Sequence, residues 1–189
     1  PAGTTDVQTP VNVRKKRVYQ PVEQTIISIT EADVTQAGAR NIITLSDKNE
    51  ITVYSRASQD VLTPEITYQL PAGKKGITLS AQAVKGGLAQ IFVSVLNDTR
   101  ATISTLVLEN KNGTLENIYT LAYFVKELGC AGAKTIWAQR PFVLGTKPGN
   151  ARNVIAADGK FTLGKDSFNT RHNWLTGLTR YPVETARQE

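Results

Sequence analysis

The residues with the greatest potential for chemistry lie in the last third of the chain. The segment Gly159–Asp166 reads G-x-x-x-x-G-K-D, which matches a phosphate-binding P-loop up to its final position. A P-loop needs Ser or Thr there as a magnesium ligand, whereas the carboxylate of Asp166 would face the phosphates. Phe161 and Leu163 alternate with Thr162 between the two glycines, which is typical of a strand. This segment is therefore predicted to be one half of a hairpin.

Nucleophilic and metal chemistry have few candidates in this chain. Cys130 is the only cysteine and His172 the only histidine, so zinc sites with several Cys or His ligands are excluded by count. A Cys130–His172 pair, or His172 with Ser167 and Asp166, has the residue types for nucleophilic catalysis. However, Cys130 lies among glycine and alanine, and His172 lies in a polar tail. We therefore predict a protein that is not an enzyme and that has no cofactor or metal.

The net charge of +6 is concentrated at the two ends of the chain. Residues 1–24 hold four basic and two acidic residues, and residues 130–189 hold nine basic and four acidic residues. Residues 25–129 are nearly neutral, with nine basic and ten acidic residues. Charge asymmetry of this kind indicates ends that contact a polyanion or an acidic partner surface. The clearest candidates for phosphate or partner contact are four adjacent cations, Arg14, Lys15, Lys16 and Arg17.

Three regions are expected along the chain. Residues 1–24 contain three prolines and few apolar residues, which predicts an extended, basic N-terminal arm. Residues 25–164 are expected to form a single β-rich globular domain, and residues 165–189 a polar C-terminal arm. A few aromatic and apolar side chains would anchor the two arms: Tyr19, Trp174, Leu178 and Tyr181.

Four pairs of β-rich runs flank short turns and predict antiparallel pairing. The most apolar pair surrounds the polar residues 97–100, and it looks like the buried centre of the domain. Asp158-Gly159 is the strongest turn signal, because a type I′ turn needs positive φ at both central residues. The four predicted pairs are 41–46 with 51–55, 66–70 with 77–81, 88–96 with 101–108, and 153–157 with 160–163.

Residues 115–128 show a different period. Leu115, Ile118, Leu121, Val125 and Leu128 recur every three or four residues, which predicts one face of a helix. Aromatic and apolar residues at 119, 121 and 123 also alternate, so a strand remains an alternative. The predicted fold is mainly β, an antiparallel sandwich or barrel with one helix at about 115–128 and extended arms at both ends.

These features favour a structural subunit of a large symmetric assembly, with a virus or bacteriophage particle as the expected class (capsid, decoration or tail protein). Its partners would be copies of itself, other subunits of the particle and, through the basic arm, nucleic acid. No apolar run approaches the roughly 18 residues of a membrane span, and the first residues do not resemble a signal peptide. We therefore expect a virion protein assembled in the host cytoplasm. The alternatives are a nucleic-acid-binding module and, less favoured, a small hydrolase.

Overall fold

The computed structural model describes residues 23–168 apart from residues 37, 39, 59–60, 85–86, 99–101, 129–134, 141–149 and 158–159. Within these ranges all regular elements are strands, and no helix there is long and apolar enough to span a membrane. The strands are β1 (Ile26–Ala32), β2 (Asn41–Ser46), β3 (Glu50–Ser58), β4 (Val61–Gln69), β5 (Lys74–Ala83), β6 (Ala89–Asn97), β7 (Thr102–Lys111), β8 (Thr114–Leu121), β9 (Phe124–Leu128), β10 (Thr135–Gln139), β11 (Ala151–Ala157) and β12 (Lys160–Phe168).

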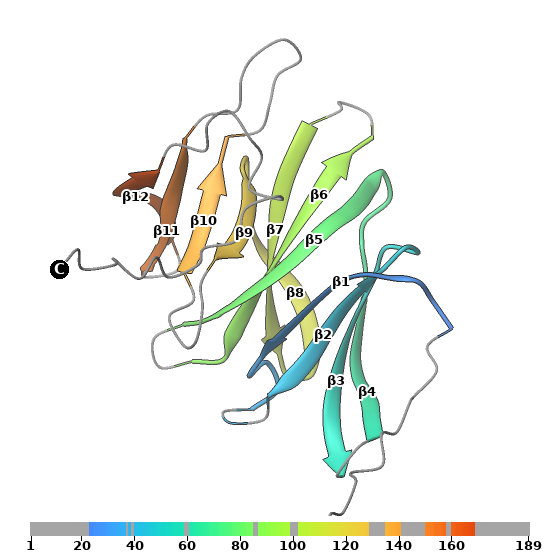
Figure 1. Cartoon of the computed structure of the whole chain (residues 1–189). Helices are drawn as coiled ribbons and strands as arrows, with labels where there is room; N and C mark the ends of the chain where they lie inside the picture. The colour runs from blue at the N-terminus through green and yellow to red at the C-terminus, as the bar shows by residue number, and fades with distance from the viewer. Residues whose placement is uncertain are drawn as a thin grey trace, which may run out of the picture.

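The strands form three four-stranded sheets in which every neighbouring pair is antiparallel. The first sheet has the order β1-β2-β3-β4, the central sheet β5-β6-β7-β8, and the third sheet β12-β11-β10-β9. Figure 1 shows the central sheet between the other two. The predicted class, mainly β with antiparallel pairing, is confirmed.

The central sheet is buried on both faces. Along β6, Ile91, Val93 and Val95 pack with side chains of the first sheet, whereas Phe92 packs in a second cluster with side chains of the third sheet. Strand β7 alternates in the same way, with Val107 in the second cluster. A strand that is covered on both faces has no exposed side, which fits the continuous burial of β6 from Ala89 to Val95.

Three buried hydroxyl groups attach the third sheet to the central sheet along β9. The Ser94 hydroxyl accepts a hydrogen bond from Val125 N (3.1 Å) and donates to Val125 O (3.0 Å). The Thr105 hydroxyl donates to Tyr123 O (2.7 Å), and Ser80 Oγ accepts from Glu127 N (2.8 Å). The backbone groups satisfied in this way belong to alternate residues, so these hydroxyls replace a neighbouring strand along the outer edge of β9.

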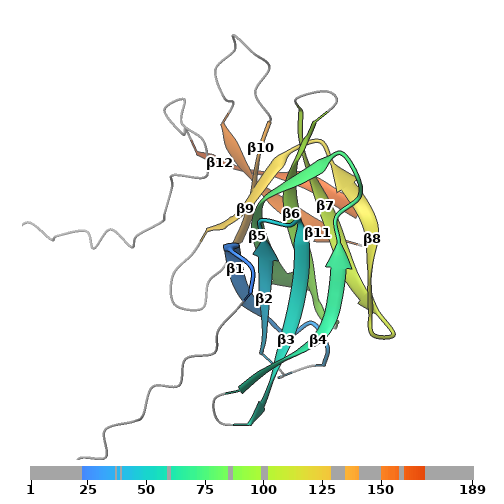
Figure 2. The same cartoon turned by 90° about the vertical axis from the view of Figure 1, so that its right-hand side faces the viewer.

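The outer edge of β5 is covered by side chains of the first sheet. Ser28 Oγ accepts a hydrogen bond from Leu79 N (2.9 Å), and Asn49 Oδ1 accepts one from Gly76 N (2.9 Å). Figure 2 shows β1 running next to β5 at this edge. An edge whose amides are already bonded cannot add a strand from another chain, so β5 is protected from edge-to-edge association.

The helix predicted at about 115–128 is wrong, because these residues form β8 and β9. The ladder between β7 and β8 shifts register between Val107 and Leu108, so that Ile118 is an extra residue in β8. One extra residue changes which face the following side chains point to. Leu115 consequently packs against the first sheet and Leu121 against the third. The spacing of three came from a bulge and not from a helix.

Of the four predicted pairs, three are confirmed as β2–β3, β6–β7 and β11–β12. The fourth is wrong: residues 66–70 and 77–81 lie largely in β4 and β5, which belong to different sheets. The residues between β4 and β5 therefore cross from the first sheet to the central one. Strand β12 continues to Phe168, past the predicted domain boundary at 164, and residues 169–189 lie outside the described residues.

Candidate interaction site

The residues singled out for charge or anchoring lie outside the part of the chain that the structure describes. This applies to Arg14, Lys15, Lys16, Arg17, Tyr19, Trp174, Leu178 and Tyr181, and also to Cys130 and His172. Among the described residues, no group of three or more His, Cys, Asp or Glu side chains is arranged to hold a metal ion. The remaining candidates for a site are the surfaces and cavities of the three sheets.

The P-loop-like segment is a strand, as the sequence predicted. Phe161 in β12 packs edge-on against Phe92, with ring centroids 5.8 Å apart, so it belongs to the core between the central and third sheets. The Arg152 guanidinium donates to Gly164 O from Nε (3.0 Å) and Nη2 (2.6 Å). This carbonyl lies where β12 bulges away from β11. The backbone of the segment is used in strand pairing and in this contact, so it does not form a phosphate cradle.

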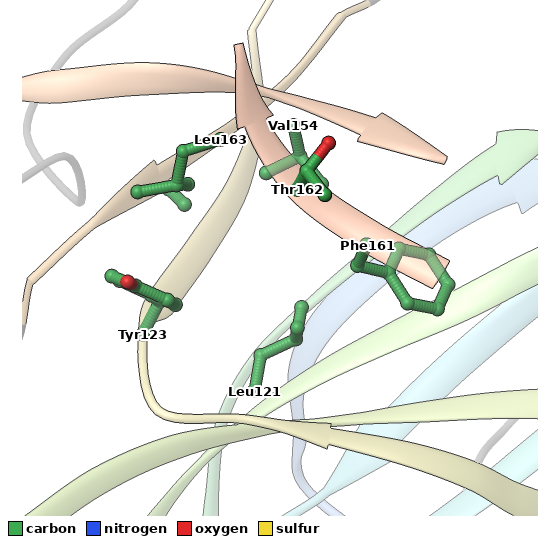
Figure 3. Close-up of a pocket in the computed structure, with 7 residues that line it drawn as sticks. Leu121, Tyr123, Val154, Phe161, Thr162 and Leu163 are labelled. Atoms are coloured by element: carbon green, nitrogen blue, oxygen red, sulfur yellow. The ribbon is translucent and has the colours of Figure 1, made fainter. Parts of the chain in front are cut away.

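A small cavity lies between the central and third sheets (Figure 3). Its volume is about 80 Å³, and its walls are mainly apolar. Side chains from β8, β10, β11, β12 and the turn after β8 converge on it: Leu121, Tyr123, Ala138, Val154, Phe161, Thr162 and Leu163. Ligand pockets usually enclose about 300–1,000 Å³. This cavity is therefore a packing void and not a binding site.

A larger groove crosses the outer face of the first sheet. Its volume is about 550 Å³, within the range of ligand pockets, and all four strands of the sheet contribute to it. The strand pairing places its residues in rows across the sheet: Ile29 opposite Thr44 and Thr44 opposite Thr52, then Ile42 opposite Tyr54 and Tyr54 opposite Pro64. The complete lining is Glu23, Gln24, Ile26, Ile29, Ile42, Thr44, Ser46, Glu50, Thr52, Tyr54, Leu62 and Pro64.

Apolar side chains are exposed on β1 at this groove. Ile29, which lines the groove, is 64% exposed, and Ile26 lines it from the start of the same strand. Isolated exposed apolar residues are common, but here they adjoin a groove with further isoleucine, leucine, tyrosine and proline side chains. These side chains make part of the groove apolar, next to the buried Thr44 and Thr52.

The groove carries negative charge at one end. Glu23 and Glu50 are its only charged lining residues. Gln24 Nε2 donates a hydrogen bond to Glu50 Oε1 (3.1 Å), which fixes this carboxylate at the start of β3. Within the described residues neither carboxylate has a salt bridge, whereas Lys111 and Glu116 form one between β7 and β8 (3.1 Å). The groove is thus apolar towards Tyr54 and Pro64 and acidic towards Glu50.

The sequence contained a signal for this surface that motif searching does not detect. Isoleucine occupies adjacent positions in β2 (Ile42 and Ile43). Neighbouring residues in a strand point to opposite faces, so such pairs make both faces of a sheet apolar. One face forms the core, with Ile43 fully buried, and the other forms the groove, with Ile42.

Comparisons of the chain with protein-family models, with curated proteins and with solved structures find no match.

Proposed function

We propose that this protein is a non-enzymatic structural subunit of a large symmetric assembly, a virus or bacteriophage particle, whose terminal arms contact neighbouring subunits. In this proposal the three sheets are a layered β-sandwich that provides a rigid body. The body presents the groove of the first sheet on its outside, and the arms make contacts between subunits.

The observation that carries this proposal is the exposed, apolar groove beside the point where the N-terminal arm joins the body. Glu23 and Gln24, the first described residues, themselves line the groove. A surface made for contact and a basic segment of 22 residues are therefore adjacent in one molecule. Such an arrangement suits subunits that interlock, because each copy supplies both a segment and a surface.

The nucleic-acid-binding alternative is supported by Arg14, Lys15, Lys16 and Arg17 and opposed by the groove. Glu23 follows the basic cluster by six residues, and Glu50 lies at the same end of the sheet. Carboxylates at this position repel phosphates, whereas they attract the cations of a protein segment. The described surface next to the arm therefore favours a protein partner.

The test compares the full chain with a variant that lacks residues 1–22. The full chain should form rings, tubes or shells in negative-stain images and large particles in light scattering. The truncated chain should keep the far-ultraviolet spectrum of a β protein but sediment as a monomer. A full chain that stays monomeric at all concentrations, or a truncated chain that assembles as the parent does, would refute the proposal.

The salt dependence of DNA binding distinguishes the nucleic-acid-binding alternative from the proposed function. Binding of DNA through four phosphate contacts should weaken with salt at a slope of about −3.6 in log K against log salt concentration. Under the proposed function, binding to DNA is weak, and assembly does not depend on adding it.

A further inference from the structure

The groove of the first sheet has the chemistry of a receptor for a segment that is apolar at one end and cationic at the other. Its apolar end is formed by Tyr54, Leu62 and Pro64, and its acidic end by Glu23 and Glu50. Four residues separate Glu50 from Tyr54 along β3, which corresponds to about 13 Å in a strand. The occupant must therefore present cations about four residues from its apolar side chains.

Charge distinguishes between the occupants. The same face of a second copy would bring two more carboxylates and no cation from the groove itself, so both acidic ends would lack a partner. Nucleic acid would place phosphates against the carboxylates. A segment with adjacent cations satisfies Glu23 and Glu50, neither of which has a salt bridge within the described part of the chain.

The N-terminal segment of this chain has the required pattern. In an extended segment alternate side chains share one face. At odd positions the sequence has Val7, Val11 and Val13, followed by Lys15 and Arg17. Val11 precedes Lys15 by four positions, the same spacing as between Glu50 and Tyr54 along β3.

From these features we infer that the groove of the first sheet binds residues 7–17 from a neighbouring copy of this chain. Val11 and Val13 lie on the apolar floor, and Lys15 and Arg17 pair with Glu50 and Glu23. The inference rests on the proposed function, which supplies the neighbouring copy, and it adds the site at which the arm is bound.

Cysteine cross-linking of full-length chains tests this site, because a disulfide forms only where two Cα atoms approach within about 7 Å. All proteins carry Cys130→Ser, so that no native thiol is present. One protein carries Val11→Cys or Val13→Cys and an affinity tag that changes its mass, and the other carries Ile29→Cys. The matched control carries Ile155→Cys, an isoleucine of the third sheet that is 45% exposed. Each variant is first shown to assemble to the size of the parent.

Oxidation of the mixed assembly should give a dimer of the two different chains with Ile29→Cys and at least fivefold less with Ile155→Cys. Replacing both groove carboxylates (Glu23→Gln with Glu50→Gln) should lower the yield about two- to tenfold, as expected for two exposed ion pairs. Glu116→Gln, on the central sheet, should leave the yield unchanged.

Three results would overturn the inference. The first is equal cross-linking to Ile29→Cys and Ile155→Cys. The second is a link within one chain when Val13→Cys and Ile29→Cys are combined, which would show that the arm binds its own groove. The third is loss of the mixed dimer on adding a DNA oligonucleotide at constant ionic strength, which would assign the cations to nucleic acid. In all three cases arm-dependent assembly would still support the proposed function, whereas absence of assembly would refute that function itself.

Discussion

Replacing Ser94 by alanine should loosen the third sheet from the central one. Ser94 is fully buried, and its hydroxyl bonds both the N–H and the C=O of Val125 in β9. It also lies 2.9 Å from the Thr105 hydroxyl, which donates to Tyr123 O. The two hydroxyl protons satisfy the carbonyls of Val125 and Tyr123, and Ser94 Oγ accepts the hydrogen bond of the Val125 N–H. The serine is therefore the centre of a polar network between two apolar layers.

The cost of Ser94→Ala follows from the groups left behind. Val125 is itself fully buried, so water does not replace the missing partner of its N–H or its C=O. A buried polar group without a partner costs about 1–3 kcal/mol, so two such groups predict a loss of about 2–6 kcal/mol in the free energy of unfolding. For a chain of this size, a loss in the middle of that range lowers the melting temperature by roughly 8–16 °C.

Urea and thermal denaturation at a fixed protein concentration measure this loss, and hydrogen exchange locates it at the amide of Val125. Ser167→Ala is the control, because Ser167 is exposed on β12 and should change stability by less than about 0.5 kcal/mol. Ser94→Thr keeps the hydroxyl and should retain protection of the Val125 amide. A loss below about 1 kcal/mol for Ser94→Ala with the Val125 amide still protected would refute the assigned role of the hydroxyl.

Two further changes test the packing of the first sheet. Gly76→Ala should destabilise the protein by about 1–3 kcal/mol, because a Cβ at Gly76 would lie 2.7 and 2.8 Å from the δ carbons of the buried Leu45. Leu45→Ala removes these carbons. In urea denaturation, the double variant should therefore lose less stability than the sum of the two single variants. Burial raises the pKa of Tyr68 above 10.0, so its contribution to stability is present below pH 10 and is lost as the pH rises above that value. Tyr68→Phe should therefore reduce the alkaline loss of stability, whereas Tyr119→Phe, at an exposed position, should leave it unchanged.

Turn signals in the sequence predicted strand pairs correctly where the two paired strands follow each other directly in the chain. The turn at 47–49 and the turn signal Asp158-Gly159 are each bounded by β-rich runs that pair with each other, and so are the polar residues predicted between β6 and β7. A turn signal of the same kind at 70–73 gave a wrong pair, because the β-rich runs on either side of it belong to different sheets. A turn fixes a change of direction but not the partner of the next strand, and at β5 the choice depends on β6, which follows it.

The predicted helix failed for a related reason. The helix prediction places Leu115 and Leu121 on one face, where both would pack against the same core. The protein has clusters on both sides of the central sheet, and these two leucines belong to different ones. In a strand with apolar residues on both faces, one bulge is enough to produce the spacing expected of a helix.

Side chains close the outer edges of β5 and β9, and these contacts bear on where other molecules can bind. Ser28 and Asn49 cover amides of β5, and Ser80, Ser94 and Thr105 cover β9, so these edges are used inside the molecule. The groove of the first sheet has no such cover among the described residues, and its lining combines apolar side chains with threonines and two glutamates. Two sheet edges are thus covered by polar side chains, whereas Ile29 stays exposed beside the groove, and this contrast supports our proposal that the groove contacts another chain.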